Sequence, residues 1–514
     1  MDSAKIWIMV TIAVYLIGMV GIGVYCSRKN ENVGDFYLGG RKLGPFVTAM
    51  SAEASDMSSW LLMGLPGLAY LSGIADPGWT AIGLAVGTYV NWLVVAKRIR
   101  TYTHVAGNSI TLPDFFSRRY RDNKNVLMCI AAIFIVIFFI PYTASGFAAC
   151  GKLFSSLFGV DYLPAMIISA IVIVAYTATG GFLAASTTDL IQSIVMSIAL
   201  IIVICFGVSV AGGMDAVMTN AKAMPGYFSM MFTHSVEENA ANPYSFLTIA
   251  STFAWGLGYF GMPHILLRFM AIEDKEKLKL SRRIASVWVV IAMIVAILIG
   301  VVGNAMTSAG AIETLEGSGS ETIIVRIADL LSQHGALAAI LAGVILAGIL
   351  ASTMSTADSQ LLAASSSVSH NLVQGVFHAN ISEKGAMVAA RISVLVISII
   401  GMFIARNPDS SVFGIVSFAW AGFGAVFGPV VMMALFWKRS NKNGALASMV
   451  VGGVMVFVWK YLVKPMGGVW NIYELLPAFL LALAANIIVS LLTKAPEKEI
   501  VEEFELVQKM TNEK

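Results

Sequence analysis

The amino-acid sequence predicts an all-α polytopic membrane protein. Of its 514 residues, 58% are hydrophobic and only 12% are charged, whereas soluble domains carry roughly 25% charged residues. The apolar residues gather in blocks of about twenty, the length at which a helix spans a bilayer. Strands of a membrane barrel would be about ten residues long and would alternate in polarity, so helices are expected instead.

Counting these blocks predicts about thirteen transmembrane helices. The first block, Ile6 to Cys26, is followed by no small-residue cleavage site, so we interpret it as a retained helix and not as a signal peptide. One transmembrane domain is expected over residues 1–494, and a short solvated cytoplasmic tail over residues 495–514. The predicted spans are centred near residues 16, 60, 88, 138, 173, 200, 256, 293, 353, 397, 424, 453 and 482.

The distribution of Lys and Arg predicts the orientation in the membrane. The loops after the first, third, seventh and eleventh spans are basic, with Arg268 counted in the seventh, whereas alternate loops carry almost no basic residues. Basic loops stay on the cytoplasmic side. The N-terminus is therefore expected outside and the C-terminus inside. The outer loop 305–335 contains an amphipathic helical pattern, typical of either a surface cap or an outer lid.

The second predicted span contains the stretch "SAEASDMSSWLLMGLPG", which holds two carboxylates and is expected to break at Gly64 and Pro66. A carboxylate at the centre of a span costs about 2.5–3.5 kcal/mol on insertion scales, so it faces the protein interior or water. Asp56 is expected either to serve the function or to anchor a neighbouring helix through a hydrogen bond. For Glu53, the anchoring role and the functional role are equally compatible with the sequence.

The seventh predicted span, "WGLGYFGMPHILLRF", is also interrupted, because several glycines and Pro263 fall close together. Two interrupted spans five apart indicate a transporter core of two inverted five-helix repeats, here about 45–212 and 245–437. A close helix crossing built on small residues is the alternative for the seventh span. The unpaired backbone groups of a broken helix can hold a carboxylate or a cation.

The ninth predicted span presents a stripe of hydroxyl groups. Ser352, Ser355, Thr356 and Ser359 recur with helical spacing, and Asp358 lies beside them. Hydroxyl and carboxylate oxygens suit a hard cation such as Na⁺, although such hydroxyls also bond back to their own helix. Asp189 follows a hydroxyl cluster in "YTATGGFLAASTTDLIQS", where it is expected to be either an N-cap of the sixth span or part of a polar site.

The stretches "SAEASDMSSWLLMGLPG", "YTATGGFLAASTTDLIQS", "WGLGYFGMPHILLRFMA" and "MSTADSQLLAASS" together resemble the sodium:solute symporter family, and the likeness covers nearly the whole chain. The motifs are most similar to those of its bacterial proline-transporting members. The resemblance implies a sodium-coupled symporter of the bacterial inner membrane that imports a small amino acid, with L-proline favoured, by alternating access. Uptake of another small carboxylate or amino acid, with Na⁺ or H⁺, is the alternative.

Membrane-embedded enzymes and receptors are not favoured. No histidine lies in an HExxH motif, and no signalling module follows residue 494. The expected partners are the substrate and the lipid bilayer, with no nucleic acid and no obligatory protein partner.

The resemblance also implies site residues. Tyr142, Trp255 and Tyr259 match substrate contacts, and Met262 stands where glutamine is usual in the proline-transporting members, which leaves the substrate open. Arg41 matches a coupling residue, or serves as a basic membrane anchor. A possible second cation site comprises Asp189, Asp358 and Ser359, so the stoichiometry stays open. The implied Na⁺ ligands are the carbonyls of Ala54, Met57 and Ser352 and the hydroxyls of Ser355 and Thr356, with Asp56 as the required carboxylate.

Overall fold

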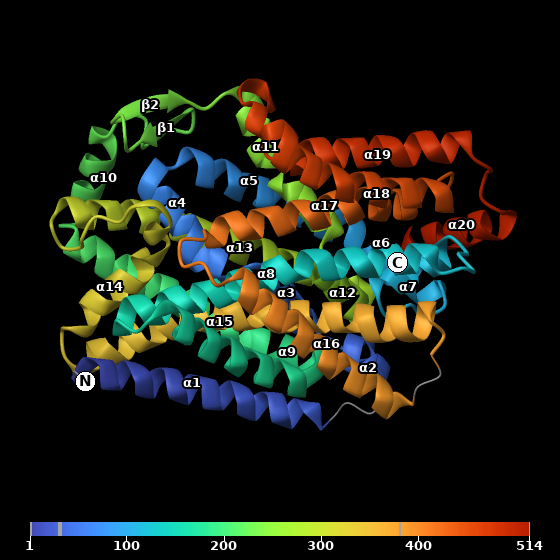
Figure 1. Cartoon of the computed structure of the whole chain (residues 1–514), viewed down its shortest axis with the longest axis horizontal. Coiled ribbons are helices and arrows are strands. Elements are labelled where there is room, and N and C mark those ends of the chain that lie inside the picture. Colours follow the sequence, from blue (N-terminus) through green and yellow to red (C-terminus); the bar gives the residue numbers. More distant parts are fainter. Residues whose placement is uncertain (1–2, 29–32, 380–381, 513–514) are drawn as a thin grey trace.

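The computed structural model describes residues 3–28, 33–379 and 382–512. It consists mostly of long helices that run roughly side by side (Figure 1). Ten helices in this part of the chain are long and apolar enough to cross a membrane, which confirms the expectation of a multi-pass helical protein. The uninterrupted long helices are α1 (Ser3–Ser27), α8 (Val126–Phe158), α13 (Leu278–Ser308), α15 (Ala336–Ser366), α16 (Glu383–Ile404), α17 (Val412–Phe436), α18 (Lys442–Val458) and α19 (Leu475–Leu492).

The second predicted span is interrupted at Ala54–Met57, the backbone of the implied ion ligands, and not at Gly64 and Pro66. Helix α3 (Pro45–Asp56) ends at Met57, whose φ of −74° and ψ of 67° are not helical. The chain then continues through a π-helical turn (Trp60–Gly64) into α4 (Leu65–Ser72). Gly64 and Pro66 lie inside this helical stretch, so the predicted break there is wrong. Pro66 lies two residues after the π-helical turn, and the helix continues through it to Ser72.

The seventh predicted span is interrupted as expected. It consists of α11 (Phe246–Phe253), a 3₁₀ segment (Ala254–Gly261) and α12 (Pro263–Ala271). The 3₁₀ segment packs with its backbone against α5 (Ala75–Val90), since a Cβ added to Gly87 would lie 2.4 Å from the Cα of Gly256. Interruption and close crossing therefore occur together in this span. Helix α5 continues through a π-helical turn (Asn91–Val95) into α6 (Ala96–Val105).

The fifth and sixth predicted spans form one bent element, α9 (Tyr162–Val210). The bend lies at Gly181, whose φ of 68° belongs to the region that favours glycine. Asp189 lies inside the helical stretch Gly181–Val210 and is fully buried. The N-cap interpretation of Asp189 is therefore wrong, because the helix begins before the hydroxyl cluster.

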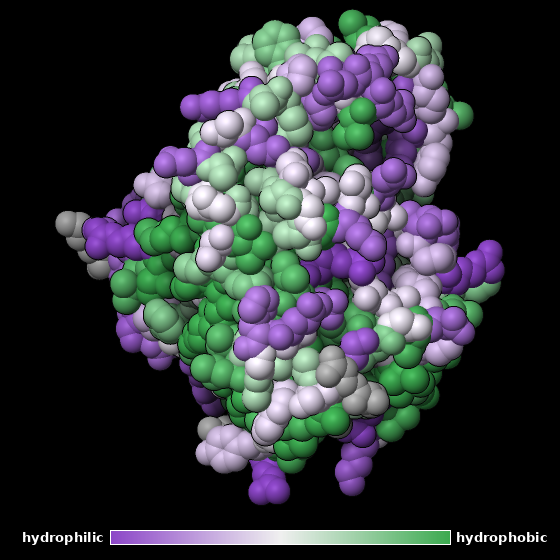
Figure 2. Space-filling view, turned by 90° about the vertical axis from the view of Figure 1, so that its left-hand side faces the viewer, coloured by the Kyte–Doolittle hydropathy of each residue, from purple (hydrophilic) through white to green (hydrophobic). Residues whose placement is uncertain are grey.

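One end of the molecule, here called the hairpin end, carries α10 (Met214–Ala223), the antiparallel strands β1 (Phe232–Ser235) and β2 (Ala240–Pro243), and α14 (Ile323–Ser332). Figure 2 shows this end with hydrophilic residues spread over it and a hydrophobic area at the left and lower part of the view. Most apolar side chains of α14, including Ile323 and Ile327, are buried, and Leu330 is partly buried. Of the two alternatives for loop 305–335, this packing favours the cap.

The opposite end, here called the tail end, carries α2 (Val33–Leu38), α7 (Leu112–Arg119) and α20 (Lys498–Asn512) (Figure 1). The expected solvated tail is wrong, because α20 buries Ile500, Phe504 and Val507 on one face. Glu503 on this helix forms a 2.5 Å ion pair with Arg121. Within the predicted domain and tail, residues 1–2, 29–32, 380–381 and 513–514 lie outside the described residues.

The contact between α5 and the 3₁₀ segment generates a prediction. Gly87→Ala is expected to destabilise the protein by about 1–3 kcal/mol, because the added methyl group meets backbone that cannot move aside. Thermal unfolding in detergent measures the effect. Gly21→Ala in α1 is the matched control, because nothing lies within 4 Å of the added atom. Equal stability of both variants would contradict the close backbone crossing.

Candidate functional site

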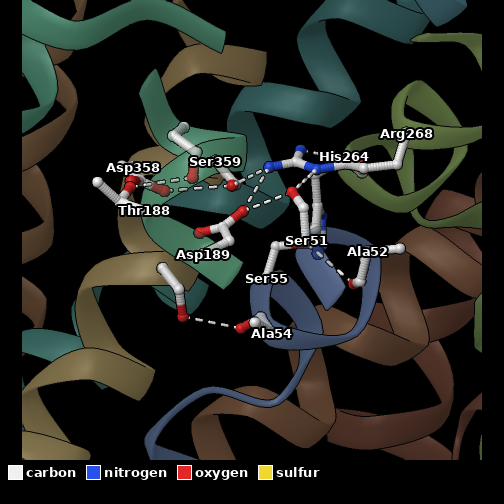
Figure 3. Close-up of polar contacts among 12 residues, drawn as sticks. Ser51, Ala52, Ala54, Ser55, Thr188, Asp189, His264, Arg268, Asp358 and Ser359 are labelled. Carbon is white, nitrogen blue, oxygen red and sulfur yellow. Dashed lines mark hydrogen bonds and ion pairs between the residues drawn. The ribbon is translucent and has the colours of Figure 1, made fainter. Parts of the chain in front are cut away.

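The interruption of the second span faces α15. The Ser355 hydroxyl donates a hydrogen bond to the carbonyl of Ala54 at 2.8 Å, and this carbonyl contact is drawn in Figure 3. The same hydroxyl lies 3.2 Å from the carbonyl of Ser352, and the Thr356 hydroxyl donates to that carbonyl at 3.1 Å. All of these residues are buried. The structure thus brings together Ala54, Ser352, Ser355 and Thr356 from the predicted ion site.

The backbone explains why the Ala54 carbonyl is available. In a continuous helix this oxygen would accept the N–H of Ser58, but that N–H bonds to the carbonyl of Asp56 at 2.8 Å. The helix therefore ends one bond early, and the N–H of Met57 makes the last regular contact, to Glu53 at 2.8 Å. Met57 is fully buried at this end of α3.

Asp56 connects the interruption to the predicted substrate contacts. Its Oδ2 accepts a hydrogen bond from the Tyr259 hydroxyl at 2.6 Å, and its backbone carbonyl accepts one from Tyr142 at 3.3 Å. Its Oδ1 is buried and has no hydrogen-bond partner among the described residues. Trp60 also donates to the Asp56 carbonyl, at 3.0 Å. One carboxylate oxygen thus remains available to a further donor or to a cation.

The other two predicted substrate contacts, Trp255 and Met262, lie on the seventh predicted span, as Tyr259 does. The ring centroids of Trp255 and Trp60 are 6.4 Å apart, and the Trp255 carbonyl accepts a hydrogen bond from Trp420 at 2.8 Å. Met262 is fully buried directly before Pro263, where the helix resumes. Its thioether therefore occupies an interior position at the second half-helix.

The residues of the predicted second cation site form one network with a residue that the sequence analysis assigned to a loop. Arg268 is 1% exposed and lies in the last turn of α12, where its guanidinium is 3.2 Å from the Oδ2 of Asp189. The same group donates to the hydroxyls of Ser51 and Ser359, and Ser51 donates to Asp189 at 2.6 Å (Figure 3). Ser359 in turn donates to Asp358 at 3.2 Å.

Arg268 therefore supplies a positive charge at the residues for which a second cation site was considered. The guanidinium pairs directly with the buried carboxylate of Asp189, whereas buried Asp358 is linked to it only through Ser359. Asp189 Oδ1 and Asp358 Oδ2 have no hydrogen-bond partner among the described residues. The signal that could have placed Arg268 is its closeness to Pro263. Helix α12 begins at Pro263, and its next turns, which include Arg268, lie in the protein interior.

Two further charged residues have structural partners. Glu53 accepts hydrogen bonds from Thr88 at 2.9 Å and Trp92 at 2.8 Å, which favours its anchoring role between α3 and the third span. Arg41 precedes α3 and donates to the carbonyls of Met270 at 2.6 Å and Ser109 at 2.8 Å. Burial lowers the pKa of Arg41 to about 10, which still leaves it cationic at neutral pH.

The Arg268 network generates a stability prediction. Asp189→Asn is expected to destabilise the protein by about 3–5 kcal/mol, because it leaves a buried guanidinium without its charged partner. Thermal unfolding in detergent measures it. Glu273→Gln is the control: its ion pair with Lys277 is exposed (42% and 47% of the two side chains), so a loss of about 1 kcal/mol or less is expected. An Asp189→Asn variant that is as stable as the wild type would contradict the buried ion pair.

Two solved transporter structures are similar to this chain in fold. A Na⁺-coupled sialic acid symporter, solved in a substrate-bound outward-open state, is 17% identical, covers 96% of this chain and 99% of its own, and superposes with a TM-score of 0.76. A nucleobase-cation symporter in a closed conformation is 13% identical, covers 92% of this chain and 98% of its own, and gives a TM-score of 0.52. At these identities the likeness concerns the fold.

Sequence comparison extends over the whole chain. The model of the sodium:solute symporter family matches residues 36–452. A sodium/proline symporter of Haemophilus influenzae is 42% identical and covers 98% of both chains. One from Escherichia coli is 40% identical, covering 96% of this chain and 95% of its own. An osmoregulated proline transporter of Bacillus subtilis is 38% identical, covering 99% and 100%. The chain therefore belongs to the sodium:solute symporter family.

Proposed function

We propose that this protein is a sodium-coupled symporter that imports L-proline by alternating access. In this proposal it is a transporter and not an enzyme. The full-length relatives named sodium/proline symporters support this assignment. The observation that carries it is the Ala54 carbonyl, released by the interruption of α3 and faced by the Ser355 hydroxyl of α15 at 2.8 Å. A buried pair of oxygens from two helices can supply the first two ligands of a dehydrated cation.

The donor set fits Na⁺ as the co-transported ion. Na⁺ is a hard cation, and the proposed ligands are neutral oxygens: the carbonyls of Ala54, Met57 and Ser352 and the hydroxyls of Ser355 and Thr356. A cation between the two helices would take the Ala54 and Ser355 oxygens as ligands, so the Ser355 hydroxyl proton would turn away. The free Oδ1 of Asp56 lies on the same segment and supplies negative charge.

Coupling follows from the shared interruption. Tyr142 and Tyr259, which the proposal assigns to the substrate, both donate to Asp56, which is next to the ion ligand Met57. Ion binding that fixes this backbone also fixes the two tyrosines, so each ligand improves the affinity for the other. A Na⁺ that moves with the membrane potential supplies about 2.3 kcal/mol per 100 mV.

The proposed substrate pocket joins Tyr142, Trp255, Tyr259 and Met262. Aromatic faces pack against an apolar ring and attract an ammonium group. The N–H groups released at the start of α12 are suited to a carboxylate. Met262 supplies a flexible, apolar wall in this pocket.

The wider arrangement is also part of the proposal. Ten long helices, the two interrupted spans and the shorter apolar helix Tyr162–Ala175 together make thirteen spans. We assign the inverted repeats to about 45–212 and 245–437 within domain 1–494, followed by segment 495–514. The hairpin end, which contains the start of α1, is assigned to the outside and α20 to the cytoplasm (Figure 1). Arg41 acts in coupling by linking Thr103 of α6 to Met270 of α12.

The second cation site is proposed in a modified form. Asp189 and Ser359 hold the Arg268 guanidinium in this conformation, and Asp358 accepts a hydrogen bond from Ser359. The two carboxylates exceed the one guanidinium by one negative charge. One additional monovalent cation or proton therefore completes the charge balance there.

The decisive experiment is uptake of labelled proline into proteoliposomes. Uptake is expected with an inward Na⁺ gradient and is expected to be abolished when choline replaces Na⁺. Equal uptake in both conditions would contradict sodium coupling. A Na⁺-driven current without proline uptake would instead favour another small carboxylate or amino acid.

The proposed ion ligands predict a specific change in Na⁺ dependence. Ser355→Ala and Thr356→Ala are each expected to raise the half-saturating Na⁺ concentration about tenfold, as for the loss of one hydrogen bond to a charge. Ser352→Ala is the matched control. Its hydroxyl bonds to Ile349 of its own helix, and its carbonyl is retained, so its Na⁺ dependence should be unchanged. Equal behaviour of all three variants would remove the assignment.

A further inference from the structure

The last helix, α20, connects the tail ends of the two proposed repeats (Figure 1). On the side of the first repeat, Glu503 forms its 2.5 Å ion pair with Arg121, which lies directly after α7. On the side of the second repeat, Lys275 follows α12 and donates a hydrogen bond to the carbonyl of Met510 at 2.5 Å. Alternating access moves one repeat against the other. One short helix therefore bridges segments that have to move relative to each other.

Phe504 of α20 contacts two arginines of the first repeat. Its ring centroid lies 4.9 Å from the guanidinium group of Arg98 on α6 and 5.4 Å from that of Arg119 on α7. Arg119 is fully buried, and its Nη1 and Nη2, like the Nε and Nη2 of Arg98, have no hydrogen-bond partner among the described residues. An aromatic face attracts a cation most strongly where water is excluded. The two guanidinium groups are therefore held through a ring that belongs to α20.

Helix α20 is attached in a way that permits its release. A link of four residues without regular structure, 494–497, separates it from α19. Its fully buried side chains are apolar and lie on one face: Ile500, Phe504 and Val507. Segments with few buried apolar contacts open at a lower free energy than the core of a protein. We therefore expect α20 to leave its site while the transmembrane helices stay folded.

The conformation of the structure is open at the end opposite to α20. A cavity of about 440 Å³ lies toward the hairpin end, where Ser72 and Trp255 are part of its wall. On the tail side of the Arg268 network, Tyr37 and Ser366 line a cavity of about 10 Å³, room for about one water molecule. The larger cavity thus lies at the end that is assigned to the outside.

From this geometry we propose that α20 is a conformational clasp. In the docked position it holds the tail ends of the two repeats together and stabilises the conformation with the larger cavity outside. When it undocks, the Phe504 ring leaves Arg98 and Arg119, the tail end opens, and the ion and the substrate leave toward the cytoplasm. This inference rests on the proposed function, because it assigns a regulatory segment to the same transport cycle.

Cysteine labelling at the two ends tests the clasp. Ser72→Cys reports on the hairpin-end cavity and Ser366→Cys on the tail-end cavity, each in a chain whose four native cysteines are replaced by alanine. The rate of maleimide labelling is measured without Na⁺ and substrate. Phe504→Ala is expected to lower the fraction of molecules open at the hairpin end to about a third. Labelling of Ser72→Cys should then slow about threefold and labelling of Ser366→Cys should accelerate.

Matched variants of α20 serve as controls. Leu506→Ala should leave both labelling rates unchanged, because Leu506 lies on the same helix but is 50% exposed. Glu503→Gln loses the ion pair with Arg121 and should shift the labelling in the same direction as Phe504→Ala. Glu502→Gln should not, because its partner Lys498 belongs to the same helix.

Uptake into proteoliposomes separates the clasp from the proposed function. In Phe504→Ala the half-saturating external Na⁺ concentration should rise about threefold, because only outward-facing molecules bind external Na⁺. If Phe504→Ala is less stable but labels at the rates of Leu506→Ala, α20 is a structural anchor only and the clasp is refuted. If Phe504→Ala does not fold, Glu503→Gln decides by the same labelling. Absence of Na⁺-dependent uptake by the wild type would refute the proposed function, whereas the labelling would still decide on the clasp.

Discussion

The early end of α3 is the constraint on which the rest of the proposed site depends. Because the Ser58 N–H turns to Asp56, the Ala54 carbonyl is left in the protein interior without a helical donor. A buried carbonyl in that position costs about 1–3 kcal/mol unless it is paired, and Ser355 of α15 pairs it. The same end of the helix holds Asp56 between Tyr142 and Tyr259. In the proposed mechanism, one irregularity of the backbone thus serves the ion and the substrate together.

The Arg268 network places a second constraint on movement. It joins α3, α9, α12 and α15 through Ser51, Asp189, Arg268 and Ser359. In the proposed repeats, α3 and α9 belong to the first and α12 and α15 to the second. Any rearrangement between the repeats must therefore break this buried ion pair or carry it along intact. Such pairs add little stability relative to apolar packing, but they favour one arrangement of the charges.

Local sequence signals failed where tertiary packing decides the outcome. Gly64 and Pro66 looked like a break, yet both are helical, and Gly64 allows close contact, since a Cβ there would lie 3.0 Å from Phe413. The C-terminal segment looked like a solvated tail because it is rich in Glu and Lys. Phe504, however, packs against the guanidinium groups of Arg98 and Arg119, with ring distances of 4.9 and 5.4 Å.

The sequence by itself determined the helical membrane fold, the two interrupted spans and the hydroxyl stripe of α15. These depend on hydrophobicity, backbone chemistry and helical period, which are local properties. Only the tertiary structure decided that Ser355 meets Ala54 and that Arg268 lies between Asp189 and Ser359. The residues in each of these groups are far apart in the chain, and only packing sets the distance between them.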